Sequence, residues 1–136
     1  MKEFLKKDYE NLITVDLVCH GTPSPKLWEK YIDFQTKKYN SRITDINFRN
    51  KTYGYHSGTM MLKFENGKKY TGSARVDYML KSFFSEIASR PSCYTCKFKQ
   101  LNRVSDYTVF DCWHMGELLG KKDDDRGYTN LLVHTD

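Results

Sequence analysis

The sequence predicts an α/β chain, with an α+β variant also open, in which a mixed β-sheet is flanked by helices. The chain has 136 residues, the size of one ordinary domain. β-branched runs alternate along it with stretches of helical apolar spacing. Hydrophobic residues make up 39% and charged residues 29%, as in folded proteins. We therefore expect a single domain over residues 1–136 that buries a core without disulfides.

The first forty residues predict helix, strand and helix in that order. Residues 1–9 have the composition of the last turns of a helix. Residues 12–18 (LITVDLV) form a nearly continuous apolar run, typical of a strand buried on both faces. Ser24 is suited to cap the N-terminus of a helix and Pro25 to occupy its first turn. The apolar spacing that follows predicts an amphipathic helix over residues 25–39.

The middle of the chain predicts a strand, a loop and a hairpin. Apolar and polar residues alternate over residues 43–49, which indicates a strand. Residues 50–58 are polar and rich in Tyr and Gly, so we expect a long loop. The strands predicted at residues 59–64 and 68–71 flank Asn66-Gly67, and Asn-Gly is the strongest short signal for a hairpin.

The last third predicts a helix and two strands. Apolar residues at helical spacing predict a helix over residues 74–88, which Pro91 closes. A cysteine-containing loop follows, and a strand is expected over residues 104–110. Residues 121–127 form a charged turn that leads into a final strand over residues 128–134.

The charge balance is mildly basic. Lys and Arg number 22 against 17 Asp and Glu, a net charge of +5. The densest cluster is Lys97, Lys99 and Arg103, whereas nucleic-acid-binding proteins usually show a clearer basic stripe, so we expect no nucleic-acid partner. No apolar run is long enough for a transmembrane helix, and residues 1–7 lack the apolar core of a signal peptide. The expected location is the cytoplasm, without membrane attachment.

The four cysteines are the candidate metal ligands. Cys93 and Cys96 form a Cys-x-x-Cys pair, which in a cytosolic chain indicates metal binding or redox chemistry rather than a structural disulfide. A 4Fe-4S cluster needs four thiolates, commonly a short pair plus residues from distant loops. Cys19, expected at the end of a central strand, is a candidate third ligand, and Cys112 is an open candidate for the fourth. Alternatively, Cys19 and Cys112 are buried apolar residues.

A second group of residues is placed where a flavin and its pyrophosphate could bind. Its members follow predicted strands: Gly21, Thr22, Ser24, Arg49, Lys51 and Asp111. The first three form a turn before a helix N-terminus, where backbone amides can bind phosphate. Arg49 and Lys51 could neutralise a phosphate or an anionic flavin ring, and Asp111 could orient a cofactor. The alternatives are a turn formed for geometry alone, solvated loop charges and a turn-forming aspartate.

Four stretches together resemble the C-terminal domain of coenzyme F420 hydrogenase/dehydrogenase beta subunits. They are residues 16–28 (DLVCHGTPSPKLW), residues 46–51 (INFRNK) with Tyr53-Gly54, residues 90–98 (RPSCYTCKF) and residues 105–113 (SDYTVFDCW). They occur in the family's order and span nearly the whole chain. The resemblance implies an iron-sulfur flavoprotein oxidoreductase. Its members move electrons between a 4Fe-4S cluster, FAD and a partner such as a deazaflavin, a ferredoxin or another reductase.

The chain departs from the family pattern in two respects. Family members usually carry a ferredoxin-like segment with several cysteines and a Gly-x-Pro-Cys-Gln motif upstream, and both are absent here. The position of Cys112 is more often Phe in the family, and His114-Met115 replaces the usual Gly-Ile. We expect a C-terminal fragment that is inactive alone. The resemblance assigns the fourth cluster ligand to the missing upstream cysteine, whereas this sequence by itself offers Cys112.

Two other functions remain open from the sequence. Cys93, Cys96, Cys112 and His114 have the number and the approximate spacing of a tetrahedral zinc site, which would make the chain a structural zinc module that binds a protein or nucleic acid. The second pair is unusual, because zinc modules commonly separate such ligands by two to five residues. The chain could also be an interaction domain that keeps the family fold without cofactors.

Overall fold

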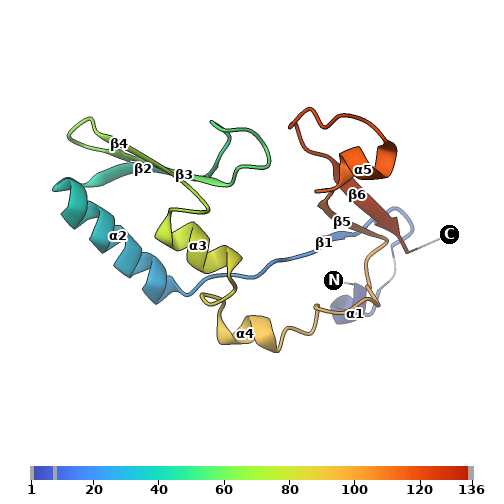
Figure 1. Ribbon diagram of the computed structural model, residues 1–136. Helices are drawn as coiled ribbons and strands as arrows, with labels where there is room; N and C mark the ends of the chain where they lie inside the picture. The colour runs from blue at the N-terminus through green and yellow to red at the C-terminus, as the bar shows by residue number, and fades with distance from the viewer. Residues whose placement is uncertain (1, 8, 135–136) are drawn as a thin grey trace.

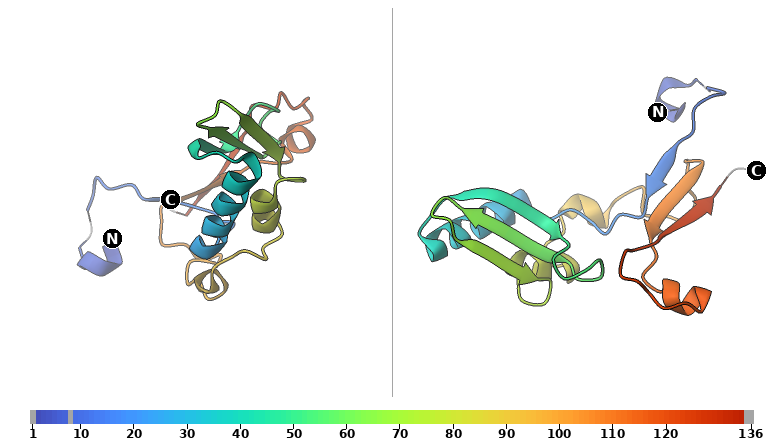
Figure 2. Two further views of the ribbon diagram at one scale, coloured as in Figure 1. Left: turned by 90° about the vertical axis from the view of Figure 1, so that its left-hand side faces the viewer. Right: turned by 90° about the horizontal axis from the view of Figure 1, so that it is seen from above.

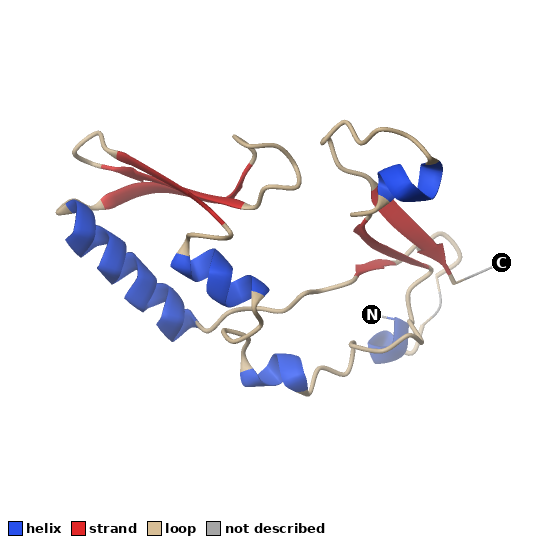
Figure 3. Cartoon of the chain, viewed as in Figure 1, coloured by secondary structure: helices blue, strands red, loops and turns tan. Residues whose placement is uncertain are grey.

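The computed structural model describes residues 2–7 and 9–134 and confirms the α/β class (Figure 1). Figure 3 colours the helices blue and the strands red, and shows how the two kinds of element follow one another along the chain. Within these residues the elements are α1 (Lys2–Leu5), β1 (Val15–Leu17), α2 (Pro25–Tyr39), β2 (Ile43–Asn50), β3 (Thr59–Phe64), β4 (Lys69–Ser73), α3 (Tyr78–Phe84), α4 (Pro91–Tyr94), β5 (Tyr107–Asp111), α5 (Met115–Leu119) and β6 (Thr129–Val133). None of the helices in this part of the chain has the length and apolar character needed to cross a membrane.

The strands form two sheets of three strands each. The predicted mixed sheet has the order β1-β5-β6, with β1 parallel and β6 antiparallel to the central strand β5. The other sheet, in the order β2-β3-β4, is antiparallel throughout, and each of its pairs joins two strands that are consecutive in the sequence. The two sheets lie at opposite ends of the molecule in Figure 1 and in the right view of Figure 2. The strands expected in one sheet are therefore divided between two.

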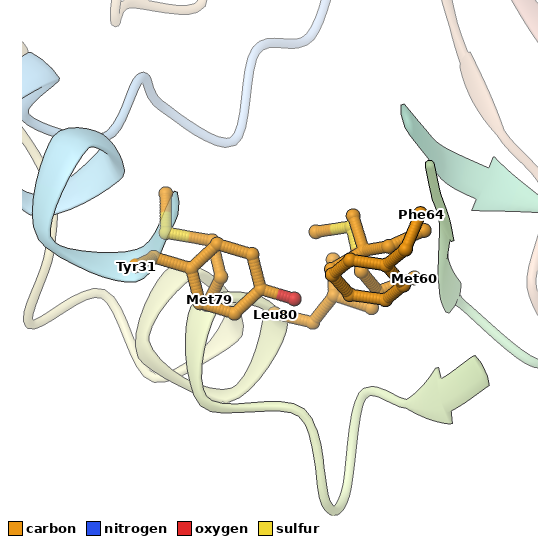
Figure 4. Packing of buried hydrophobic residues seen from close by; sticks show 6 residues of the cluster. Tyr31, Met60, Phe64, Met79 and Leu80 are labelled. Carbon is orange, nitrogen blue, oxygen red and sulfur yellow. The ribbon is translucent and has the colours of Figure 1, made fainter. Parts of the chain in front are cut away.

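The main core lies between the antiparallel sheet and two helices. Helices α2 and α3 cover one face of this sheet (Figure 2). Alternate residues of β3 point toward the helices, as the two-residue period of a strand requires. The buried cluster consists of Tyr31, Met60, Leu62, Phe64, Met79 and Leu80 (Figure 4). Burial of these apolar side chains stabilises the α2-α3 end of the molecule.

Local sequence signals located two elements well. Helix α2 begins at Pro25, with Ser24 at the N-cap position, and ends at Tyr39, followed by the C-cap residue Asn40 in the left-handed conformation. The Ser24 side chain makes no capping hydrogen bond, so proline and the apolar spacing define this helix start. The predicted hairpin is also confirmed, because Gly67 has φ +79° and Phe64 N donates to Lys68 O at 3.0 Å. Glycine adopts this conformation without strain.

The helix expected over residues 74–88 is shorter. Helix α3 spans only Tyr78–Phe84, because residues 74–76 form a turn and Asp77 caps the helix, accepting a hydrogen bond from Leu80 N at 2.9 Å. Val76 and Ile87 belong to the periodic pattern but are exposed. The cysteine-containing segment expected as a loop includes the short helix α4, and the sequence pattern missed helix α5.

The prediction of a strand buried on both faces at residues 12–18 was wrong. Strand β1 has three residues and lies at the edge of its sheet, so the position expected for Cys19, after a central strand, is also wrong. Val15 and Leu17 are 58% and 61% exposed. No described element covers the face of the sheet that carries them. An apolar run is buried only where another element packs against it, so the run alone did not determine its burial.

The other face of the mixed sheet carries a polar network centred on Asp16. The Thr108 hydroxyl donates to the Asp16 carboxylate, and Arg103 Nη1 lies 3.2 Å from Asp16 Oδ2. Thr108 Oγ1 also lies 2.8 Å from His134 Nε2. The Thr108 hydrogen bond, followed by the charge of Arg103, holds the pKa of Asp16 below its usual range, against the opposing effect of burial. Folding therefore favours the ionised form of Asp16.

This network predicts a pH dependence of stability. Because the pKa of Asp16 is lower in the folded chain, its contribution is complete above about pH 4, the unfolded value. That contribution is lost as the pH falls through the folded pKa. In Thr108→Val we expect a shallower decline of stability below pH 4, measured by urea unfolding at several pH values. The control Thr44→Val removes a hydroxyl that bonds only a backbone carbonyl, so an equal change in the control would contradict the prediction.

Candidate functional site

The loop between β1 and α2 is held against the segment that carries α4. Thr22 N donates to Cys93 Sγ at 3.4 Å, and Arg90 N donates to Thr22 O at 2.9 Å. Pro23 pairs with Ser89 in an isolated β-bridge. We call this region, residues 19–24 with residues 88–96, the cysteine junction. It brings two predicted groups together, the phosphate-binding turn and the Cys-x-x-Cys pair.

Gly21 permits the close approach of the two segments. Its φ is +140°, and a Cβ at this position would lie 3.1 Å from Ser89 Oγ and 3.9 Å from Cys93 Sγ. Cys93 is half-buried in the junction, whereas Cys19 and Cys96 are exposed. A side chain at position 21 would therefore crowd the Ser89 hydroxyl and strain the backbone, which adopts a conformation that favours glycine.

Two backbone amides of the predicted turn already have partners within the protein. Thr22 N donates to the Cys93 sulfur, and Ser24 N donates to Ala88 O at 3.0 Å. At the start of α2, Pro25 has no N–H, and Leu27 N and Trp28 N both donate to Ser24 O, so a phosphate in this turn would find few backbone amides to bind.

Cys112 lies outside the cysteine junction. It is buried directly after β5, and its backbone N–H donates to Tyr128 O at 2.8 Å. Residues 2–7 and 9–134 contain no group of three His, Cys, Asp or Glu side chains placed to hold a metal ion. A 4Fe-4S cluster requires four thiolates around one compact centre. In this arrangement the thiols do not fit a cluster held by this chain alone, nor a zinc site that uses Cys112 with the Cys-x-x-Cys pair.

Three other predicted residues gather around Tyr55. The Tyr55 hydroxyl donates to Asp111 Oδ1, and Lys51 Nζ lies 4.2 Å from the centre of the Tyr55 ring. Lys51 Nζ also donates to Tyr55 O at 3.1 Å. The hydrogen bond to Asp111 raises the pKa of Tyr55, and the nearby charge of Arg49 opposes this effect. The structure thus joins the end of β2 to the end of β5 through Tyr55, which no sequence motif marked as a site residue.

Two more rings and two aspartates complete this region. The centres of the Tyr55 and Trp113 rings are 5.4 Å apart, and those of His56 and Trp113 are 5.7 Å apart. His56 Nε2 lies 2.8 Å from Asp123 Oδ2, while His56 N donates to Asp125 Oδ1 at 2.9 Å. Hydrogen bonds from the Asp125 amide and the His56 ring hold the pKa of Asp123 below its usual range. The abundance of Tyr and Gly in residues 50–58 was the available signal for this region.

We call these residues the Tyr55 cluster: Arg49, Lys51, Tyr55, His56, Asp111, Trp113, Asp123 and Asp125. Trp113 is 48% exposed, and the side chains of Arg49 and Lys51 are also exposed. An open aromatic surface beside two cations can stack a planar ring and neutralise an anion. These residues therefore fit a flavin. Asp111 is occupied by the Tyr55 hydroxyl, so its role in this structure is to position Tyr55.

Comparison with known proteins gives one result. A family model that describes the C terminus of the beta subunit of coenzyme F420 hydrogenase/dehydrogenase matches residues 1–136, the whole chain. No curated protein and no solved structure matches. The matched range includes both the cysteine junction and the Tyr55 cluster.

Proposed function

Because the chain belongs to the family formed by the C-terminal domains of coenzyme F420 hydrogenase/dehydrogenase beta subunits, we propose that it is an electron- or hydride-transfer domain of an iron-sulfur flavoprotein oxidoreductase. The observation that carries this proposal is the family match over residues 1–136. We propose further that the whole chain acts as one C-terminal-type domain. Beta subunits belong to enzymes of several subunits, so a redox partner protein, or a deazaflavin or ferredoxin donor, would complete the reaction.

The Tyr55 cluster would bind FAD. Lys51 and Arg49 would neutralise a phosphate or the negative charge of a reduced ring, and Trp113 offers an exposed surface for stacking. Asp111 would keep the Tyr55 ring in place through the hydroxyl hydrogen bond. When bound, the flavin supplies the capacity to accept a hydride or two electrons. The protein contributes position and charge.

The cysteine junction would contribute ligands to an iron-sulfur cluster. We propose Cys93, Cys96 and Cys19 as these ligands, with the remaining thiolate supplied by another polypeptide segment. The described part of the chain does not bring these thiols into one metal-binding group. No electron-transfer step is therefore assigned to a cluster held by this chain alone.

One observation favours an interaction domain as a second candidate function. The exposed surface is 10783 Å², whereas a compact protein of 16.1 kDa exposes about 7,400 Å². Part of the excess is apolar: Val15, Leu17, Leu131 and Val133 share one face of the mixed sheet and are each more than half exposed. Exposed apolar faces of this kind commonly mark protein–protein contacts.

Cofactor loading tests the proposal. After anaerobic reconstitution with iron, sulfide and FAD, we expect FAD to bind, with quenching of its fluorescence. We expect Lys51→Ala to weaken this binding roughly tenfold, since a charged contact contributes about 1.5 kcal/mol. The control Lys37→Ala removes an exposed lysine from α2 and should bind FAD as the wild type does.

Metal analysis of the same sample separates the candidate functions. Bound iron with the broad visible absorption of iron–thiolate charge transfer supports the cluster. One zinc without a chromophore supports the structural zinc module. A folded chain that does not bind FAD overturns the oxidoreductase proposal and leaves the interaction domain, whereas a lack of iron alone is expected if the remaining thiolate belongs to another segment.

A further inference from the structure

The excess positive charge of the chain is concentrated in one segment. Residues 87–105, which we call the basic segment, contain Arg90, Lys97, Lys99 and Arg103 and no Asp or Glu, a net charge of +4. The rest of the chain has 18 basic residues, 22 minus 4, against all 17 acidic residues, a net charge of +1. Four of the five excess charges therefore lie in about one seventh of the sequence.

The basic segment is open in the structure. It runs from the end of α3 through α4 to β5, along the lower edge of the molecule between the two sheets (Figure 1, yellow to orange). Arg103 is paired with Asp16, and Arg90 Nε donates to Pro23 O at 3.0 Å. Lys97 and Lys99 are exposed, and no carboxylate among the described residues pairs with them. Their charges, and that of Arg90, remain uncompensated.

Large apolar side chains are interspersed with these cations. Each is more than two thirds exposed: Ile87, Tyr94, Phe98, Leu101 and Val104. Leu101 is 96% exposed, so it makes almost no contact with its own chain. Apolar anchors within a rim of charge are the usual composition of a protein-binding surface.

We propose that the basic segment docks an acidic protein surface, in which carboxylates surround an apolar patch. The three uncompensated cations supply charge complementarity, and the apolar side chains supply the area to be buried. Electrostatic attraction of this kind raises association rates and weakens with salt. The inference goes beyond the proposed redox function, because docking requires neither iron nor flavin.

Two other polyanions fit the segment less well. Nucleic-acid binders stack bases on aromatic rings, but three of the five exposed apolar side chains are aliphatic, namely Ile87, Leu101 and Val104. Three cations without a carboxylate partner are also few beside the roughly six to ten phosphate contacts of strong nucleic-acid binders. A lipid surface is usually bound by an amphipathic helix, whereas α4 has only four residues.

A labelled peptide tests the docking proposal. The probe is a short fluorescein-labelled peptide in which Glu alternates with Phe and Leu, and the comparison peptide carries Ser in place of Glu. Binding is followed by fluorescence anisotropy. We expect the acidic peptide to bind at least roughly tenfold more tightly than the Ser peptide at about 50 mM salt, with the difference reduced at about 200 mM.

Variants locate the binding surface. Lys97→Glu/Lys99→Glu should weaken binding of the acidic peptide at least roughly tenfold, and Leu101→Ser should weaken it without any change in charge. The control Lys121→Glu/Lys122→Glu makes the same charge change at an exposed loop and should have less than about a twofold effect. Circular dichroism confirms that each variant is folded.

Three outcomes overturn the inference. The acidic peptide could bind no better than the Ser peptide, or both lysine pairs could weaken binding equally, which would indicate a general charge effect. Oligothymidylate or phosphatidylserine vesicles could also bind the basic segment more tightly than the acidic peptide does. In that case the partner is a nucleic acid or a lipid surface and the proposed acidic protein is wrong.

Discussion

Replacing Asp77 with alanine is expected to lower the free energy of unfolding by about 4 kcal/mol. Asp77 is fully buried at the N-terminus of α3 and accepts hydrogen bonds from three donors. These are Leu80 N at 2.9 Å, the Tyr31 hydroxyl at 2.7 Å and the Tyr70 hydroxyl at 3.0 Å. Burial, together with the Asp77 carboxylate, raises the pKa of both tyrosines, so both hydroxyls stay protonated as donors.

The expected magnitude follows from the groups left without a partner. Loss of an N-cap costs about 1 kcal/mol, and each buried hydroxyl without a partner costs about 1–3 kcal/mol. Tyr31 lies in the core cluster, where no solvent can replace the carboxylate (Figure 4). Urea unfolding measures the change, and Tm should fall by roughly 10 °C or more.

Two variants control this experiment. Asp77→Asn keeps an oxygen that can cap the helix and accept one tyrosine hydroxyl, so its loss should be intermediate. Asp33→Ala removes an exposed carboxylate from α2 and should change stability by less than about 0.5 kcal/mol. If Asp77→Ala is as stable as Asp33→Ala, Asp77 does not connect the two helices and the sheet as described.

A second large effect is expected for Gly127→Ala, about 3 kcal/mol of lost stability. Gly127 has φ +86°, and a Cβ there would lie 2.4 Å from the Tyr55 ring. The ring would have to move away from Trp113, and the hydroxyl away from Asp111. In a Trp28→Phe background Trp113 is the one tryptophan left, and a change in its fluorescence should report this displacement. Urea unfolding of the same variants measures the loss of stability.

The matched control is Gly67→Ala. Gly67 has a similar φ of +79°, but a Cβ there would meet nothing within 4 Å. It should lose only about 1 kcal/mol, from backbone strain, and leave Trp113 fluorescence unchanged. Equal losses in the two variants would mean that strain alone explains Gly127→Ala and that contact with Tyr55 is unimportant.

The candidate site was predictable in part. The Cys-x-x-Cys pair and the turn at Gly21 were visible from local spacing, and the structure holds them side by side in the cysteine junction. Arg49, Lys51 and Asp111 were selected separately as residues at strand ends. Their common contact, Tyr55, was missed, because Tyr55 and Asp111 are 56 residues apart and no local pattern marks the contact.

Features that depend on residues close together in the sequence were determined by the sequence alone. Proline at the helix start and apolar spacing located α2 at Pro25–Tyr39, and Asn66-Gly67 located the hairpin. The family motifs are also continuous stretches, and the match over residues 1–136 agrees with them. Backbone preferences and periodicity act over a few residues, so a sequence expresses them directly.

Only the tertiary structure decided which segments meet. It divided the strands into two sheets, left β1 at an exposed edge and, within residues 2–7 and 9–134, formed no metal-binding group from Cys112 and the Cys93 pair. The same apolar run is compatible with a buried or an exposed strand, because burial depends on what packs against it. Contacts between distant segments arise from the packing of the whole chain, and a local pattern does not specify them.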